Sequence, residues 1–212
     1  MAAATRPARA DNGRRDLLDI AIDCFARYGY QGASIDRIAK AAGLTKGAIY
    51  YHFKDKEALL FAAVKNRVGQ FERRVTRDLG AIEDAAAALR HVTEVCLEHA
   101  TRSNHRRLIV TLMVEALDTN LRLSALFRDM MRRFRAYLAA IIEIGQRAGA
   151  FRRDVRPAVA AGVYAGAVMG AEIEYYQDPE RVDLGAHLHA FLDSYLAWLG
   201  AAPPPARRKD AW

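Results

Sequence analysis

The sequence predicts an all-α protein of about nine helices, and three observations support this prediction. No proline occurs between residues 8 and 156, and because proline breaks helices, so long a gap favours helical structure. No segment alternates convincingly between apolar and polar residues, as a half-buried strand would. Apolar residues instead recur at spacings of three and four, which place them on one face of a helix.

The first expected helix has its apolar face on residues 17–28 and ends at Gly29. Ser34 can cap a short second helix, and Gly43 can supply the left-handed residue that ends it. Thr45 can cap a third short helix, which runs to about residue 52. Asp55 can cap a longer fourth helix.

Five further helices are expected downstream of Gly80, over 83–101, 104–117, 124–147, 157–176 and 183–199. Pro157 suits the first turn of its helix. The basic leader 1–13 and the tail 201–212 are expected to be disordered. The ordered part divides into an N-terminal domain, 14–56, and a larger helical domain, 57–200.

Composition excludes several classes of protein. The chain has 212 residues, a net charge of +7 and 27% charged residues, which argues against disorder. Two cysteines are too few for a disulfide scaffold or a four-cysteine zinc site. The uncharged stretch 158–171 is too short to span a bilayer, and no signal peptide is recognisable. We therefore expect a cytoplasmic protein without a membrane partner.

The positive charge is concentrated at the N-terminal end. Residues 1–56 contain ten Lys and Arg against six Asp, a net of +4, whereas residues 57–212 have a net of +3. Such a distribution fits a domain that binds a polyanion, although many basic faces are simply solvated.

Two short helices joined by the Gly43-Leu44 turn form a helix-turn-helix. In this motif the second helix enters the major groove of DNA, and its N-terminal residues meet the base edges. Lys46 can donate to the acceptors of guanine, and the small residues that follow it allow close approach. Lys54 and Lys56 lie at the start of the fourth helix, where they suit a phosphate.

The segment TKGAIYYHFKDKEALL resembles the signature of the tetracycline-repressor (TetR) family, and the resemblance covers roughly residues 14–65. It implies a homodimer that binds a double-stranded operator with two half-sites, and a C-terminal domain that binds a small effector. By position, Lys46, Gly47 and Ala48 look like base contacts. Phosphate or groove contacts would come from Thr45, Tyr50, Tyr51, His52 and Lys56. Asp36 departs from the pattern; we expect it to cap its helix, with Arg37 approaching the backbone of DNA.

The resemblance also implies that the last two helices form the dimer interface. Gly162, Gly166 and Gly170 recur every four residues and permit close helix approach. The partner stripe would comprise Leu184, Leu188, Phe191, Tyr195 and Trp198. The alternative is that these same two helices pack against each other within one chain.

The effector pocket is expected among adaptable apolar residues on the helices that would surround a cavity. These are Phe71, Met113, Leu117, Met130, Phe134, Tyr137, Tyr164 and Met169. Glu115 and Glu172 stand in apolar helices and could favour a cationic ligand. Either carboxylate could equally form a structural ion pair with an arginine.

The sequence shows no catalytic constellation, metal-ligand spacing or cofactor motif. It therefore predicts a ligand-responsive repressor, with no cofactor and no metal. The alternatives are an activator, a regulator that responds to no ligand and, from a different class, an all-helical enzyme.

Overall fold

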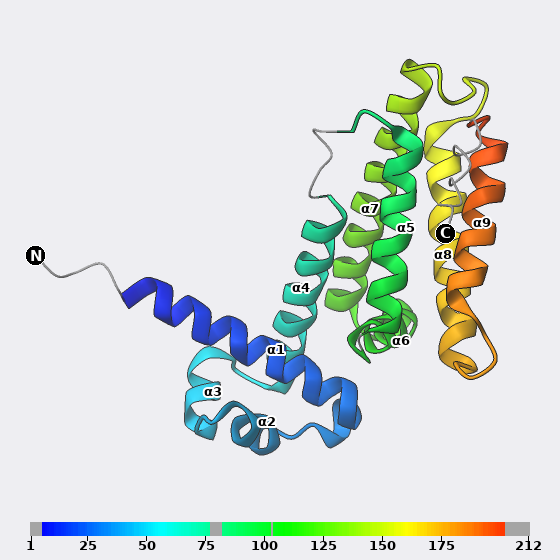
Figure 1. Ribbon diagram of the computed structural model, residues 1–212. Helices are drawn as coiled ribbons and strands as arrows, with labels where there is room; N and C mark the ends of the chain where they lie inside the picture. Colours follow the sequence, from blue (N-terminus) through cyan, green and yellow to red (C-terminus); the bar gives the residue numbers. More distant parts are fainter. Residues whose placement is uncertain (1–5, 77–81, 103, 202–212) are drawn as a thin grey trace, which may run out of the picture. The chain divides into compact units, whose positions relative to one another are not determined.

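The computed structural model describes residues 6–76, 82–102 and 104–201, and these ranges contain nine α-helices and no strand (Figure 1). The helices are α1 (Arg6–Gly32), α2 (Ile35–Ala42), α3 (Lys46–His52), α4 (Lys56–Val75), α5 (Ala85–Thr101), α6 (Asn104–Thr119), α7 (Leu121–Arg147), α8 (Pro157–Gln177) and α9 (Leu184–Trp198). The all-α prediction is therefore confirmed. None of these helices is long and apolar enough to cross a membrane.

The N-terminal helix starts earlier than expected. The backbone is helical from Arg6, within the segment 1–13 for which the sequence predicts a disordered leader. Pro7 falls in the first turn, where its missing N–H has no helical partner to lose, and the alanines and arginines that follow are good helix formers. Residues 1–5 of that leader, like residues 202–212 of the expected tail, lie outside the described residues. Gly29 has φ 68° and ψ 172°, which interrupts α1 where the sequence predicts its end.

The chain forms two compact units, and each is described by itself. The first takes in the chain up to Arg74 together with Glu98–Met131, and the second takes in Val75–Leu97 together with the chain from Arg132 onward. The expected boundary at residue 57 does not separate them.

One hydrophobic core explains why the first unit crosses that boundary. Phe25 of α1, Ile38 of α2 and Ile49 of α3 are fully buried in the same cluster as Leu59 of α4 and Ile109 of α6. The start of α7 adds further buried side chains to this cluster. The helix-turn-helix is thus held by α4 and α6 rather than forming a separate small domain.

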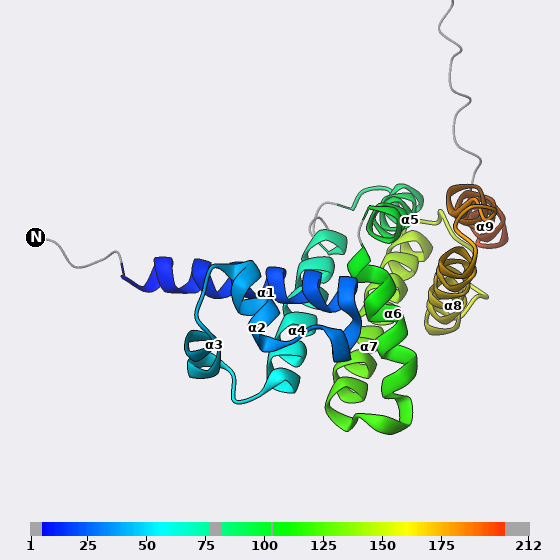
Figure 2. The same ribbon diagram turned by 90° about the horizontal axis from the view of Figure 1, so that it is seen from below.

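In the second unit, α8 and α9 lie side by side (Figures 1 and 2). Tyr164 of α8 is fully buried, and its ring packs edge-on against Phe191 and Tyr195 of α9. Its hydroxyl lies 2.6 Å from that of Thr93 on α5. Burial raises the pKa of Tyr164 well above its ordinary value, so the side chain stays a neutral part of the core.

Candidate functional site

Both short helices of the helix-turn-helix have the caps that the sequence predicts. The Ser34 hydroxyl accepts a hydrogen bond from the Arg37 backbone N–H at 3.2 Å, and the Thr45 hydroxyl accepts one from the Ala48 N–H at 3.1 Å. Gly43 adopts the left-handed conformation, with φ 65° and ψ 27°, and ends α2. These local bonds satisfy backbone groups that would otherwise be orphaned, so the turn between α2 and α3 has a defined geometry.

The inner faces of α2 and α3 are buried together. Ile38, Ala39 and Ile49 have exposed fractions of 0–4%, and Phe53 directly after α3 is also buried. Leu44 of the turn between them is 42% exposed. Burial of one face fixes which residues of α3 point outward.

The outer face of α3 consists of the residues that the sequence predicts as DNA contacts. Thr45, Lys46, Gly47, Tyr50, Tyr51 and His52 are exposed, and Ala48 is half-buried. Tyr51 is 85% exposed, so packing inside the chain does not account for this tyrosine. A Cβ at Gly47 would meet only the Thr45 hydroxyl, at 3.9 Å, so the fold itself leaves room there for a side chain.

Asp36 does not cap its helix as expected, because Ser34 fills that role. The Asp36 carboxylate instead accepts a hydrogen bond from Lys46 Nζ at 3.0 Å, joining the first turn of α2 to the first turn of α3. This bond raises the pKa of Lys46. Sequence reasoning missed the pair because the two residues are ten positions apart on different helices.

Two other predicted contact residues are held by the end of α1. Lys56 Nζ donates to the Tyr30 backbone carbonyl at 2.8 Å and lies 4.3 Å from the centre of the Tyr30 ring. The Arg37 guanidinium donates to the Gly32 carbonyl at 2.6 Å and lies 4.3 Å from the centre of the Tyr28 ring. Such cation–π contacts position the side chains without neutralising their charge.

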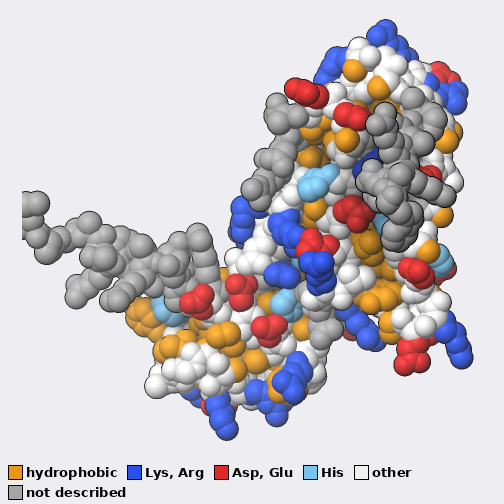
Figure 3. All heavy atoms as spheres, viewed as in Figure 1, with side chains coloured by type: hydrophobic (Ala, Val, Ile, Leu, Met, Phe, Trp, Pro, Cys, Tyr) orange, Lys and Arg blue, Asp and Glu red, His pale blue; other side chains and the backbone are white. Residues whose placement is uncertain are grey.

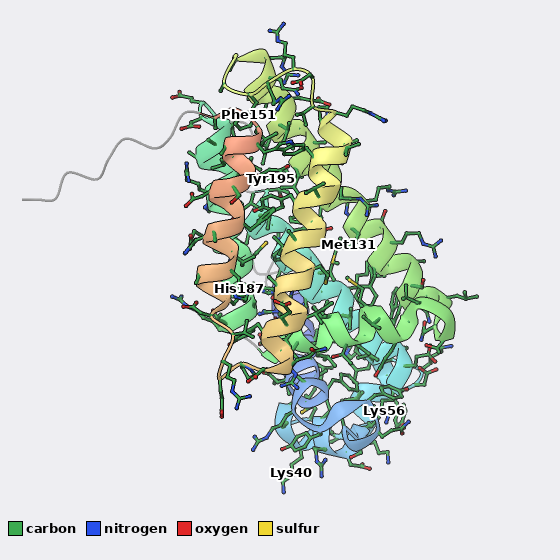
Figure 4. All side chains as sticks on the ribbon, turned by 90° about the vertical axis from the view of Figure 1, so that its right-hand side faces the viewer. Lys40, Lys56, Met131, Phe151, His187 and Tyr195 are labelled. Atoms are coloured by element: carbon green, nitrogen blue, oxygen red, sulfur yellow. The ribbon has the colours of Figure 1, made fainter. Side chains whose placement is uncertain are left out.

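The start of α4 supplies the remaining basic contact. Lys54 is exposed and forms an ion pair with Asp55 at 3.5 Å. Asp55 caps α4 by accepting from the Ala58 N–H at 2.7 Å, and this bond lowers the pKa of its carboxyl. Lysine and arginine side chains protrude from the lower surface of the part that contains α2 and α3 (Figure 3), and Lys40 stands at the tip of that part (Figure 4). Nine of the ten predicted DNA-contact residues therefore lie on α3 and its immediate flanks, and Arg37 lies on α2.

Most of the stripe expected on α9 is covered within a single chain. Leu184, Leu188 and Tyr195 are 1–3% exposed within a single chain, and Phe191 packs on Tyr195. These side chains cover α8 of their own chain, which is the alternative that the sequence left open. Figure 4 shows Tyr195 at this α8–α9 contact.

The glycines of α8 lie in a different setting. A Cβ built at Gly162, Gly166 or Gly170 has no atom of a neighbouring element within 4 Å among the described residues, so no packing contact seen there requires glycine. Val159 and Val163 of the same helix are 50% and 49% exposed. The second unit therefore presents an apolar, glycine-rich face on α8.

The ten predicted pocket residues are divided between the two units. Phe71, Met113, Glu115, Leu117 and Met130 belong to the first unit, and Phe134, Tyr137, Tyr164, Met169 and Glu172 belong to the second. Phe71, Met130, Tyr164 and Glu172 are buried, whereas Leu117 is 67% exposed. Tyr164 and Met130 are thus core residues, and Leu117 lies on the surface. Burial follows from which neighbours cover a helix, and periodicity alone does not reveal that.

Two pockets do include a predicted residue. Tyr137 lines a cavity of about 250 Å³ in the second unit, beside Val75, Ala88 and His91. Glu115 lines one of about 270 Å³ in the first unit, beside Tyr30 and Glu57. Among the described residues, no group of three or more His, Cys, Asp and Glu could hold a metal ion.

Comparison with known proteins agrees with this arrangement. The family profile of the bacterial regulatory proteins, tetR family, matches residues 17–63. The fatty acid metabolism regulator protein of Bacillus subtilis is 26% identical over 179 residues, which cover 84% of this chain and 90% of that protein. The HTH-type transcriptional repressor Rv1474c of Mycobacterium tuberculosis is 40% identical over 77 residues, covering 35% of this chain and 41% of the repressor.

Similarity to a solved structure extends over nearly the whole chain. A transcriptional regulator from Saccharomonospora viridis, crystallised in complex with choline, has a TM-score of 0.78 and 25% identity, covering 88% of this chain and 96% of the other. The exposed helix-turn-helix, the family profile and the full-length relative agree. The comparisons identify a TetR-family DNA-binding domain at residues 17–63 of this chain, within a fold that is shared with transcriptional regulators over most of its length.

Proposed function

We propose that this regulator is a homodimeric repressor that a small-molecule effector releases from its operator. The observation that supports it most directly is the exposed face of α3. The backbone that leads into this helix is fixed by Gly43, which ends α2, and by Thr45, which caps α3. A rigid, solvent-facing helix that carries lysine and two tyrosines suits insertion into the major groove.

In this proposal the start of α3 contacts the bases and the surrounding residues contact the DNA backbone. Lys46 donates to guanine, while Gly47 and Ala48 allow the helix to approach the base edges. The DNA backbone contacts come from Thr45, Tyr50, Tyr51, His52, Lys54, Lys56 and Arg37.

The dimer forms through the exposed face of α8, where two copies approach at Gly162, Gly166 and Gly170. A twofold axis there makes the contact isologous, each stripe meeting the same stripe of the partner. The operator then has two related half-sites whose centres lie about 34 Å apart, one turn of DNA.

The effector binds in the helical body and favours a dimer with the wrong spacing for the operator. The named relatives support a regulator of this kind: one governs fatty acid metabolism, and another was crystallised with choline. The Tyr137 cavity, lined by α4, α5 and α7 residues, is the site we favour. A coupling of about 1–3 kcal/mol would weaken operator binding roughly 5–150-fold.

Two lysine variants test the DNA interface. Lys46→Ala removes a base contact, so it should relax the preference for operator over scrambled DNA. Lys56→Ala removes a phosphate contact, so it should weaken binding to both duplexes and reduce the salt slope by about one unit. Fluorescence anisotropy with labelled duplexes at several salt concentrations measures both. If Lys46→Ala leaves operator affinity and preference unchanged, α3 is not the recognition helix.

An in vitro transcription assay tests the sign of regulation. With the operator placed at its natural distance from a promoter, the protein should reduce transcript, and an effector found by thermal-shift screening should restore it. An increase in transcript would identify an activator, and a protein that no screened compound releases would favour regulation without a ligand.

A further inference from the structure

We infer that Asp36 and Lys46 contact DNA as one ion-paired unit, and that Asp36 determines the specificity of recognition through Lys46. This inference rests on the proposed role of α3 in the major groove. The pair joins Asp36 Oδ2 to Lys46 Nζ at 3.0 Å, and the two side chains remain 69% and 52% exposed. Both therefore face outward on the surface that α3 presents.

The helix-turn-helix fixes the backbone position of both residues. Asp36 stands in the first turn of α2, where the helix dipole favours a carboxylate. Lys46 is the first residue of α3, and its backbone follows the Thr45 cap. The Gly43 turn fixes the distance between the two positions. An exposed ion pair adds little stability, so its effect lies in where it holds the ammonium group.

Pairing changes what Lys46 can bind. A solitary lysine attracts every phosphate, which strengthens binding to DNA of any sequence. With one N–H donated to Asp36, the ammonium retains two donors, enough for the O6 and N7 acceptors of one guanine. The nearby carboxylate repels phosphates, so the pair disfavours contacts that carry no sequence information.

Asp36 also adds an acceptor of its own. While Oδ2 holds Lys46, Oδ1 can accept from the amino group of cytosine, a group that the major groove displays beside guanine. Other charges on this surface, Arg37 and Lys40 of α2, are cationic and would remain available to phosphates. The pair is thus suited to a G·C base pair, within a surface whose other cations supply affinity.

The test is Asp36→Asn in the full chain, with operator and scrambled duplexes measured at several salt concentrations. Scrambled DNA should bind several-fold more tightly, and its salt slope should steepen by about 0.9, the value of one added phosphate contact. The ratio of operator to scrambled affinity should fall roughly fivefold or more, as expected for one lost discriminating contact. Replacing the G·C pairs of the half-site should matter less to the variant than to the wild type.

Glu180→Gln is the matched control, because it removes the same charge from an exposed residue of the second unit. It should leave the affinity ratio unchanged. Lys46→Ala also leaves the Asp36 carboxylate unpaired on the DNA-facing surface, where it repels phosphates. In a double-variant cycle, adding Asp36→Asn should therefore recover part of the binding that Lys46→Ala loses.

If Asp36→Asn strengthens binding to both duplexes by the same factor, Asp36 is only a repulsive charge and the inference is wrong. Additive single variants would likewise overturn it. Failure of the proposed function looks different: Lys46→Ala would then leave operator preference intact in every background.

Discussion

Replacing Gly145 with alanine should destabilise the second unit, because the added methyl group would clash with the ring of Phe151. Gly145 lies in α7, and the ring of Phe151, six residues further along the chain, covers it. A Cβ at position 145 would stand 2.5 Å from Phe151 Cε2 and 2.8 Å from Cγ, closer than real Cβ contacts occur. Because Phe151 is itself only 3% exposed, its ring has little room to move.

Two opposing effects set the magnitude for Gly145→Ala. Alanine in a helix interior is favoured over glycine by about 1 kcal/mol. Overpacking a buried site costs about 1–3 kcal/mol, and because several Phe151 ring atoms must shift here we take the upper part of that range, about 2–3 kcal/mol. The net expectation is a loss of about 1–2 kcal/mol, which for a protein of this size lowers Tm by roughly 2–8 °C.

Thermal and urea unfolding followed by circular dichroism measure this loss. Gly69→Ala in α4 is the control, because a Cβ there would approach only the flexible end of Arg73, at 3.3 Å. The control should be neutral or gain up to about 1 kcal/mol. Combining Gly145→Ala with Phe151→Leu should cost less than the sum of the two single changes, since the smaller side chain relieves the clash. Equal stability of Gly145→Ala and wild type would refute the steric argument.

Two further predictions concern burial and assembly. Burial, together with the positive charge of nearby Arg106, lowers the pKa of His99 from 6.5 to about 3. Between these two pH values the unfolded chain binds a proton at His99 and the folded chain does not. Stability should therefore fall as pH drops below about 6.5, by about 2–3 kcal/mol at pH 4.5 from this residue. In urea unfolding, the free energy of unfolding of His99→Leu should fall by about 2–3 kcal/mol less between pH 7 and 4.5 than that of the wild type. An equal fall in both proteins would contradict the lowered pKa of His99. Gly166→Ala should weaken dimerisation in analytical ultracentrifugation while raising helix stability by about 1 kcal/mol; an unaltered dimer would remove α8 from the interface.

Some of the site could be predicted from sequence because it depends on neighbours along the chain. The Ser34 and Thr45 caps each involve a residue three positions ahead, and the left-handed Gly43 needs only its own missing side chain. A helix-turn-helix is built from such short-range features. Its outer face follows once Ile49 is assigned to the inside, since residues about half a turn away, such as Gly47 and Tyr51, then point outward.

What could not be predicted depends on which surfaces meet. Apolar spacing shows that one face of α9 is covered, but the same spacing arises whether the cover is α8 or a second copy of the chain. The structure separates the two cases, because Leu188 is buried within one chain while Val163 is half-exposed. The Asp36–Lys46 bond has the same origin, since each residue alone has an ordinary local role as a helix-terminal acid or a groove-facing base. Only the angle at which α2 meets α3 brings the two together. That angle is why the charge of Lys46 cannot be counted separately from that of Asp36 when the affinity of this surface for DNA is considered.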